Sequence, residues 1–221
     1  MLFDDPKIYT AARDAKLGIT SLSPTLDQLR VSISEHYSIS VLHIVYDRID
    51  IGPHAERPRL NIIVDTAADF DVLHKDQFTP KRNVQDTIRR RFAKLVRQNL
   101  ADYDTDNVHI VFDDFSAEAM GHAAQQFRDA HSDGVVQAFR DANVWTVTGI
   151  GMHSIVFYLR DSDISANDKN GRSQSLIKLC FDLAQAYDEF GYFTLSTFPI
   201  AFDSKQRFDT EYKGSWFYYF R

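Results

Sequence analysis

Three aspartates stand where they could share one ligand. Asp65 directly follows the apolar run Ile62–Val64. Asp113 and Asp114 follow the apolar run Ile110–Phe112 in the same way. If both runs are strands joined by a helix, they run in the same direction and the carboxylates reach one edge of the sheet, where α/β proteins usually bind ligands. Because carboxylate oxygens suit Mg²⁺, this arrangement predicts a metal site. The alternative is that each aspartate ends a strand by bonding nearby backbone amides.

The second half of the chain has aspartates in corresponding places. Asp161 and Asp203 follow its own apolar runs, which fits either a repeated site or a repeated turn. A metal-dependent nuclease centred on Asp65 would also need a Glu-x-Lys or Gln-x-Lys on the next strand, and that segment has neither. The metal interpretation therefore depends on the aspartates alone.

A second candidate site is the basic segment Lys81–Arg97. It holds seven basic residues and one acid, Asp86, for a local charge of +6 in a chain whose net charge is −6. Arg90, Lys94 and Arg97 recur at helical spacing on the side away from the apolar stripe. Such a strip could bind phosphates or an acidic protein surface. A charge run on one helix is more often its solvated face.

The other chemically active residue types form no motif. His43, His109 and His153 each stand in or beside an expected strand, where a single histidine usually serves packing. Cys180 lies between two apolar residues in a helical pattern, which predicts a buried structural thiol. The chain has no Walker lysine loop, dinucleotide loop or nucleophile elbow, so the sequence leaves open whether it is an enzyme.

The first half of the chain must position these residues with helices and strands in a definite order. Ser23 and Pro24 predict the start of a helix, which should run to about His36. Ser116 should cap a later helix that Gly134 separates from a shorter one. The expected order is helix 24–36, strand 39–46, antiparallel strand 59–66, a loop ending near residue 80, a helix ending near residue 99, strand 108–112 and helix 116–131.

The second half gives a similar order. Strands 144–148 and 154–159, a loop over Asp161–Gly171, a helix over Leu176–Tyr187, a strand over Phe193–Phe198 and a helix over Asp203–Tyr212 are expected. The five aromatics Trp216–Phe220 should form a last strand docked on the body. The pattern predicts an α+β fold in which a mixed sheet is covered by helices, with two duplicated ββαβ halves, residues 1–132 and 133–221, packed as one compact unit.

The composition limits the classes of protein to which the chain can belong. A chain of 221 residues that is 44% hydrophobic can bury a substantial core, and its longest apolar runs are too short to span a bilayer. Asp4 and Asp5 interrupt the N-terminus, which does not resemble a secretion signal, and the single cysteine suits a reducing compartment, so we expect a cytoplasmic protein. The leading hypothesis is a binding protein whose partner is another protein or a second copy of itself. The alternative is nucleic-acid binding or metal-dependent processing through the basic segment and Asp65, Asp113 and Asp114.

Overall fold

The computed structural model describes residues 6–50, 52, 55–76 and 78–221. Asp4 and Asp5 therefore lie outside the described residues. The chain divides into two compact units, residues 1–116 (unit 1) and 117–221 (unit 2), each with its own hydrophobic core. The division expected between residues 132 and 133 stays a prediction, and both of those residues lie within one helix, α5 (Phe115–Ala138). No helix in the described ranges has the length and apolarity that crossing a bilayer requires.

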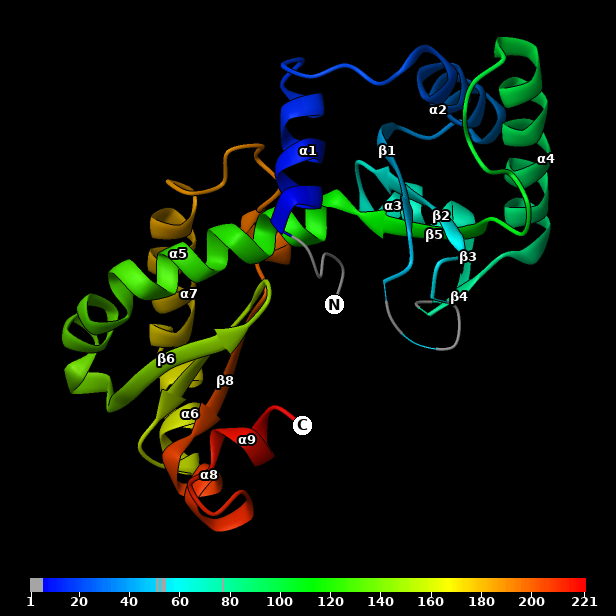
Figure 1. Cartoon of the computed structure of the whole chain (residues 1–221). Coiled ribbons are helices and arrows are strands. Elements are labelled where there is room, and N and C mark those ends of the chain that lie inside the picture. Colours follow the sequence, from blue (N-terminus) through cyan, green and yellow to red (C-terminus); the bar gives the residue numbers. More distant parts are fainter. Residues whose placement is uncertain (1–5, 51, 53–54, 77) are drawn as a thin grey trace. The chain divides into compact units, whose positions relative to one another are not determined.

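Unit 1 is built on a three-stranded mixed sheet. Its strands β1 (Val41–Arg48), β2 (Pro58–Val64) and β5 (His109–Asp114) lie in the order β1-β2-β5 (Figure 1). β1 and β2 are antiparallel, whereas β2 and β5 are parallel. The predicted antiparallel return and the predicted parallel crossover are both confirmed.

Two helices cover one face of this sheet. α2 (Pro24–Tyr37) and α4 (Arg82–Asn99) pack against each other and, with β1, β2 and β5, enclose the core of unit 1 (Figure 1). Ser23 caps α2 by accepting a hydrogen bond from the backbone N–H of Leu26, and Pro24 occupies the first turn, as predicted. The apolar stripe of α4 is buried as its spacing predicted, at Val84, Ile88, Phe92 and Val96.

The other face of the unit 1 sheet carries the alternate side chains. Because Ile44 and Ile62 belong to the core, their neighbours His43, Asn61 and Ile63 point to the opposite face. α1 (Pro6–Lys16) packs against β1. The segment expected to be a loop ending near residue 80 instead contains α3 (Ala67–Leu73) and a short hairpin of β3 (His74–Asp76) and β4 (Thr79–Pro80).

Unit 2 repeats the strand pattern of unit 1. β6 (Val144–Ile150) and β7 (His153–Tyr158) are antiparallel, and β7 is parallel to β8 (Ile200–Ser204). α5 and α7 (Arg172–Ala184) contribute buried side chains to the core on one side of this sheet. Short 3-10 turns, η1 (Arg140–Ala142) and η2 (Leu195–Thr197), and the helices α6 (Asp161–Lys169), α8 (Lys205–Glu211) and α9 (Trp216–Tyr219) complete the unit.

Two predictions about the α5 segment are wrong. Ser116 is not the cap, because α5 begins at Phe115 and the backbone N–H of Ser116 donates to the carboxylate of Asp114. Gly134 does not interrupt the helix, which continues to Ala138. The cost of an interior helical glycine is only about 1 kcal/mol, and burial of Val135 on the same helix offsets it.

Three further predictions for unit 2 are wrong. Asp161–Gly171 is mostly the helix α6, whose first turn is held by the backbone N–H of Arg160 donating to Asp163. The third strand is Ile200–Ser204 rather than Phe193–Phe198, because both of those phenylalanines pack into the core with Phe181 close to Phe198. The final aromatics form the helix α9 instead of a strand, since their rings pack around one another and do not alternate between two faces.

Candidate functional site

The three aspartates of unit 1 reach the same end of the sheet, as the sequence predicted. Asp113 pairs with Ile63 and Asp114 pairs with Val64, so both lie beside the point where β2 ends before Asp65. Consecutive strand residues point to opposite faces, which directs the side chains of Asp113 and Asp114 apart.

Each of these carboxylates already has a protein partner. Lys16 of α1 donates to Asp65 at 2.6 Å. Nδ2 of the buried Asn61 donates to Asp113 at 2.6 Å. Asp114 accepts hydrogen bonds from the backbone and hydroxyl of Ser116, at 2.9 and 2.7 Å, where α5 begins. Among the described residues no group of three or more His, Cys, Asp or Glu side chains is arranged to hold a metal ion, and the Mg²⁺ site stays a prediction.

Asp161 and Asp203 lie near the equivalent strand ends of unit 2. The hydroxyl of Ser204 donates a short hydrogen bond to Asp161 and also accepts from the backbone N–H of Arg207, which caps α8. Asp203 is 8% exposed and accepts from the hydroxyl of Tyr219 at 2.7 Å. These contacts start one helix and attach another, and both the repeated site and the repeated turn stay predictions.

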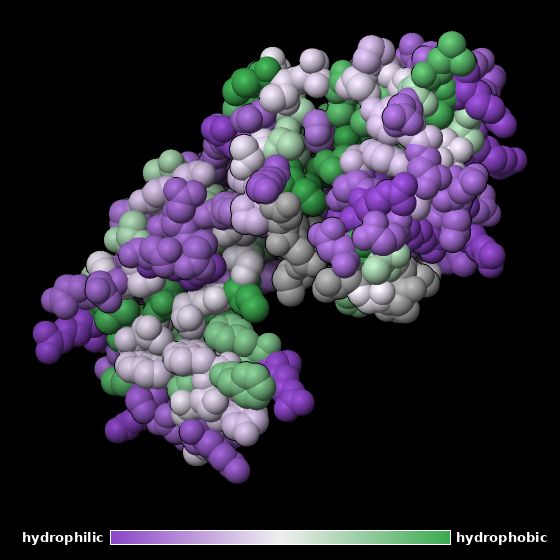
Figure 2. All heavy atoms as spheres, viewed as in Figure 1, coloured by the Kyte–Doolittle hydropathy of each residue, from purple (hydrophilic) through white to green (hydrophobic). Residues whose placement is uncertain are grey.

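The basic residues of α4 separate into two groups. Some are used inside unit 1: Arg91 bonds to Ser32 of α2, and Arg89 bonds to the carbonyl of Val108 and to Asp86. The others project outward: Arg82, Arg90, Lys94 and Arg97 are all exposed. Figure 2 shows hydrophilic side chains gathered over α4.

The outward group is largely unneutralised. Arg90 bonds only to its own helix, at the carbonyl of Asp86 and the hydroxyl of Thr87. Within the described part of the chain, the side chains of Arg82, Lys94 and Arg97 make no hydrogen bond or ion pair. We call these four residues, Arg82, Arg90, Lys94 and Arg97, the α4 stripe. The sequence analysis identified three of its members. It did not include Arg82, because Arg82 lies too far along the helix to belong to the short-range spacing of the other three.

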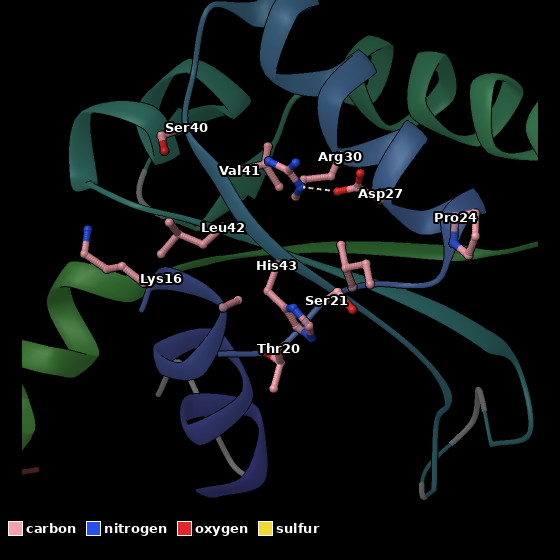
Figure 3. A pocket seen from close by; sticks show the side chains of 12 residues that line it. Lys16, Thr20, Ser21, Pro24, Asp27, Arg30, Ser40, Val41, Leu42 and His43 are labelled. Carbon is pink, nitrogen blue, oxygen red and sulfur yellow. Dashed lines mark hydrogen bonds and ion pairs between the residues drawn. The ribbon is translucent and has the colours of Figure 1, made fainter. Parts of the chain in front are cut away.

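A cavity of about 590 Å³ lies in unit 1 between the end of α1, the start of β1 and the first turns of α2 (Figure 3). The linker that joins α1 to α2 forms part of its wall through Thr20 and Ser21. β1 contributes His43, next to an irregularity in its pairing with β2. Such bulges often redirect side chains at sites. The sequence did not reveal this cavity, because its walls come from segments that no single motif connects.

The histidines and the cysteine differ in their surroundings. Burial lowers the pKa of His43, whose Nδ1 is buried with no hydrogen-bond partner among the described residues. His109 and His153 are the first residues of β5 and β7. Cys180 is fully buried in the core of unit 2, and burial raises the pKa of its thiol to about 12, so the predicted structural role is confirmed.

Comparison of the chain with protein-family models, with curated proteins and with solved structures gives no match.

Proposed function

We propose that this chain is a binding protein that docks an acidic segment of a partner protein onto the α4 stripe. The single observation that carries the proposal is the set of four exposed cations on one side of α4, none of them with an ion-pair partner in the described part of the chain. A chain with net charge −6 has enough acids to neutralise such a group, yet none of the described acids does so.

The geometry of the stripe sets the kind of partner. At about 100° per residue, the four side chains fall within about 120° of the helix circumference, opposite the buried residues. From Arg82 to Arg97 the stripe spans about 22 Å of helix axis. That length suits an acidic helix or extended segment of a partner, with carboxylates one helical turn apart. Arginine and lysine heads on long flexible stems can each reach one carboxylate.

An acidic protein segment fits better than a nucleic acid. The remaining surface is strongly acidic once the Lys81–Arg97 segment is set aside, so a long polyanion would be repelled outside the stripe. The one aromatic residue of α4, Phe92, is fully buried, so the helix offers no ring on which a base could stack.

Charge reversal tests the proposal. We would measure binding of a fluorescent glutamate-rich helical peptide to the full chain by anisotropy. The triple variant Arg90→Glu, Lys94→Glu, Arg97→Glu should bind it at least about tenfold more weakly. A matched control changes the same total charge at exposed cations of unit 2, through Arg140→Glu, Lys169→Glu and Lys178→Glu. Equal weakening in both variants, or no peptide binding by the wild type, would reject the stripe as a docking site.

Nucleic-acid binding is the second candidate. It is favoured because the cations of the α4 stripe project outward along the helix, where each could contact a phosphate. If four phosphates bind, the logarithm of the affinity for a duplex should fall with the logarithm of salt concentration with a slope of about −3 to −4. The same triple variant should lower that slope, whereas the unit 2 control should not. A duplex or single strand that binds more tightly than the peptide, through the stripe, would favour this candidate over the first.

We also propose that the two units arose by duplication of one ββαβ element. Support comes from matched details: both sheets have the same order and directions, and the first strand of each is irregular just after its first residue. Asp113 pairs with Ile63 as Asp203 pairs with Phe157, one residue before the second strand ends. Experimental coordinates in which these strands do not superpose at matched residues would contradict the duplication.

A cytoplasmic location remains part of the proposal. A single, fully buried thiol suits a reducing compartment, since it neither needs nor forms a disulfide within the chain. Imaging of the full chain tagged at its C-terminus would test it, and export of the tagged chain would contradict it.

A further inference from the structure

The cavity of unit 1 is supplied with hydrogen-bond donors. Arg30 of α2 uses its Nε to bind Asp27 at 2.8 Å, and its two terminal nitrogens have no acceptor among the described residues. The hydroxyls of Thr20, Ser21 and Ser40 likewise bond to no described group, although all three line the cavity. These groups can donate to a ligand without breaking any bond within the protein.

His43 adds a polar group whose bonding is incomplete. Its Nδ1 is buried and has no partner within the described ranges, while its ring lines the cavity. Because this nitrogen is itself covered by protein atoms, the ring can meet a molecule in the cavity only through its exposed atoms. Burial holds the pKa of this imidazole below its ordinary value, so at neutral pH the ring is uncharged and one nitrogen carries a proton to donate.

Two cations line the cavity, and each is paired with a carboxylate. Lys16 is bound to Asp65, whereas Arg30 uses only its Nε for Asp27, so the terminal nitrogens of Arg30 are the cationic donors left for a ligand. Figure 3 shows Arg30 and Asp27 joined by their ion pair, with the amine of Lys16 pointing away from them. A guanidinium with free terminal nitrogens matches the two oxygens of a carboxylate or phosphate.

From these contacts we infer that the unit 1 cavity binds a small anionic molecule through a phosphate or carboxylate group. Arg30 holds the anionic oxygens, and the linker hydroxyls and His43 bond to the polar atoms of the rest of the molecule. The volume of about 590 Å³ lies within the range of cavities that hold metabolite-sized ligands. This site is separate from the α4 stripe, and neither proposal depends on the other.

Nuclear magnetic resonance of the full chain, with its histidines labelled with ¹⁵N, tests the inference. The probes are inorganic phosphate and succinate, titrated at constant pH and ionic strength against sodium chloride. Saturable shifts of the His43 imidazole with one probe and not with chloride are expected. The probe with the lower dissociation constant identifies whether the anionic group is phosphate or carboxylate. If neither probe shifts His43 up to tens of millimolar, the inference is overturned.

Two variants distinguish a specific binding site from general electrostatic attraction of anions. Arg30→Gln should weaken probe binding at least about tenfold, and Arg30→Lys should restore part of it. Lys75→Gln, which removes an exposed cation of the same unit outside the cavity, should leave binding within about twofold. Circular dichroism verifies that all variants are folded. Equal weakening by Arg30→Gln and Lys75→Gln would show that the anion responds only to net charge and would reject the site.

Discussion

Tyr219 donates its phenolic hydrogen to Oδ2 of Asp203 at 2.7 Å, which ties the C-terminal helix α9 to the end of β8. The carboxylate it meets is nearly buried and also accepts from the backbone N–H of Ser204. Burial, together with the bond to Asp203, raises the pKa of Tyr219, so the phenol keeps its proton. The last helix is thus held by a charge-assisted hydrogen bond as well as by its aromatic rings.

Removing this hydroxyl should loosen the attachment. Tyr219→Phe leaves the buried carboxylate of Asp203 without one of its donors, which should lower the free energy of unfolding by about 1 to 3 kcal/mol. Urea denaturation followed by circular dichroism measures the change. Tyr218→Phe is the matched control, because Tyr218 is 54% exposed and should tolerate the same loss. Equal stability of the two variants would mean that the bond to Asp203 contributes nothing.

Two glycine-to-alanine changes in unit 2 should act in opposite directions. A Cβ at Gly149 would press into the carbonyl oxygen of His153 and lie 3.0 Å from the Cα of Ser154, so the hairpin of β6 and β7 would have to shift. We expect Gly149→Ala to destabilise the chain by about 2 to 3 kcal/mol. Gly134 lies inside α5 with open space around it, and Gly134→Ala should stabilise the chain by about 0.5 to 1 kcal/mol.

Thermal unfolding of both glycine variants against the wild type gives the sign of each effect. A Gly149→Ala chain as stable as the wild type would contradict the close approach of the two strands. A Gly134→Ala chain that loses stability would contradict the continuous helix that the sequence had not predicted.

The sequence predicted the parts of the fold that strong periodicity specifies. The apolar stripe of α4 and the β-branched run of β2 left little choice, and a helical crossover between β2 and β5 required parallel strands. It failed where pattern and packing disagree. The segment Phe193–Phe198 alternates like a strand, yet both phenylalanines turn into the core of unit 2 from irregular backbone. The polar helix α6 buries only Asn167, so it has no apolar stripe to reveal it.

The candidate sites divide in the same way. Asp65, Asp113 and Asp114 could be brought to one sheet edge by reasoning about strand direction, but the partners that occupy their carboxylates could not be foreseen. Lys16 reaches Asp65 from 49 residues away along the chain. The cavity that includes Arg30 and His43 is formed by the path of a linker, and nothing in the local sequence specifies such a path.

The aromatic C-terminus gives another pair of variants. Trp216 stacks on Trp145 and lies 4.1 Å, ring centroid to ring centroid, from Phe208. Trp216→Ala should therefore lower the free energy of unfolding by about 2 to 3 kcal/mol. Truncation of a fully buried tryptophan costs about 3 to 5 kcal/mol, and the loss should be smaller here because Trp216 is 37% exposed. Phe217→Ala, at a residue that is 70% exposed, should change stability by no more than about 0.5 kcal/mol. Urea midpoints that fall equally in both variants would contradict the packing of α9 on unit 2.

His43 should make the chain less stable in mild acid. Because its pKa is lowered by burial, the unfolded chain binds a proton below about pH 6.5 that the folded chain does not. Stability should therefore fall between about pH 7 and pH 5, and His43→Gln should remove that part of the dependence. The difference in unfolding free energy between wild type and variant, measured at each pH, isolates His43 from other titrating groups. A difference that does not change with pH would contradict the burial of the ring.

Cys180 should make the chain less stable as the pH rises into the alkaline range. Burial raises the pKa of its thiol to about 12, whereas an unfolded cysteine loses its proton near pH 8.5. Between these two values the folded state retains a proton that the unfolded state releases, so stability falls as pH rises, by about 1.4 kcal/mol per pH unit. Cys180→Ala lacks this contribution, although the lost sulfur costs stability at neutral pH. The difference in unfolding free energy between the wild type and Cys180→Ala should therefore shrink steadily from about pH 8.5 to pH 11, as measured by urea unfolding. An advantage that stays constant over that range would mean that the thiol ionises within the folded protein and is not enclosed by the core of unit 2.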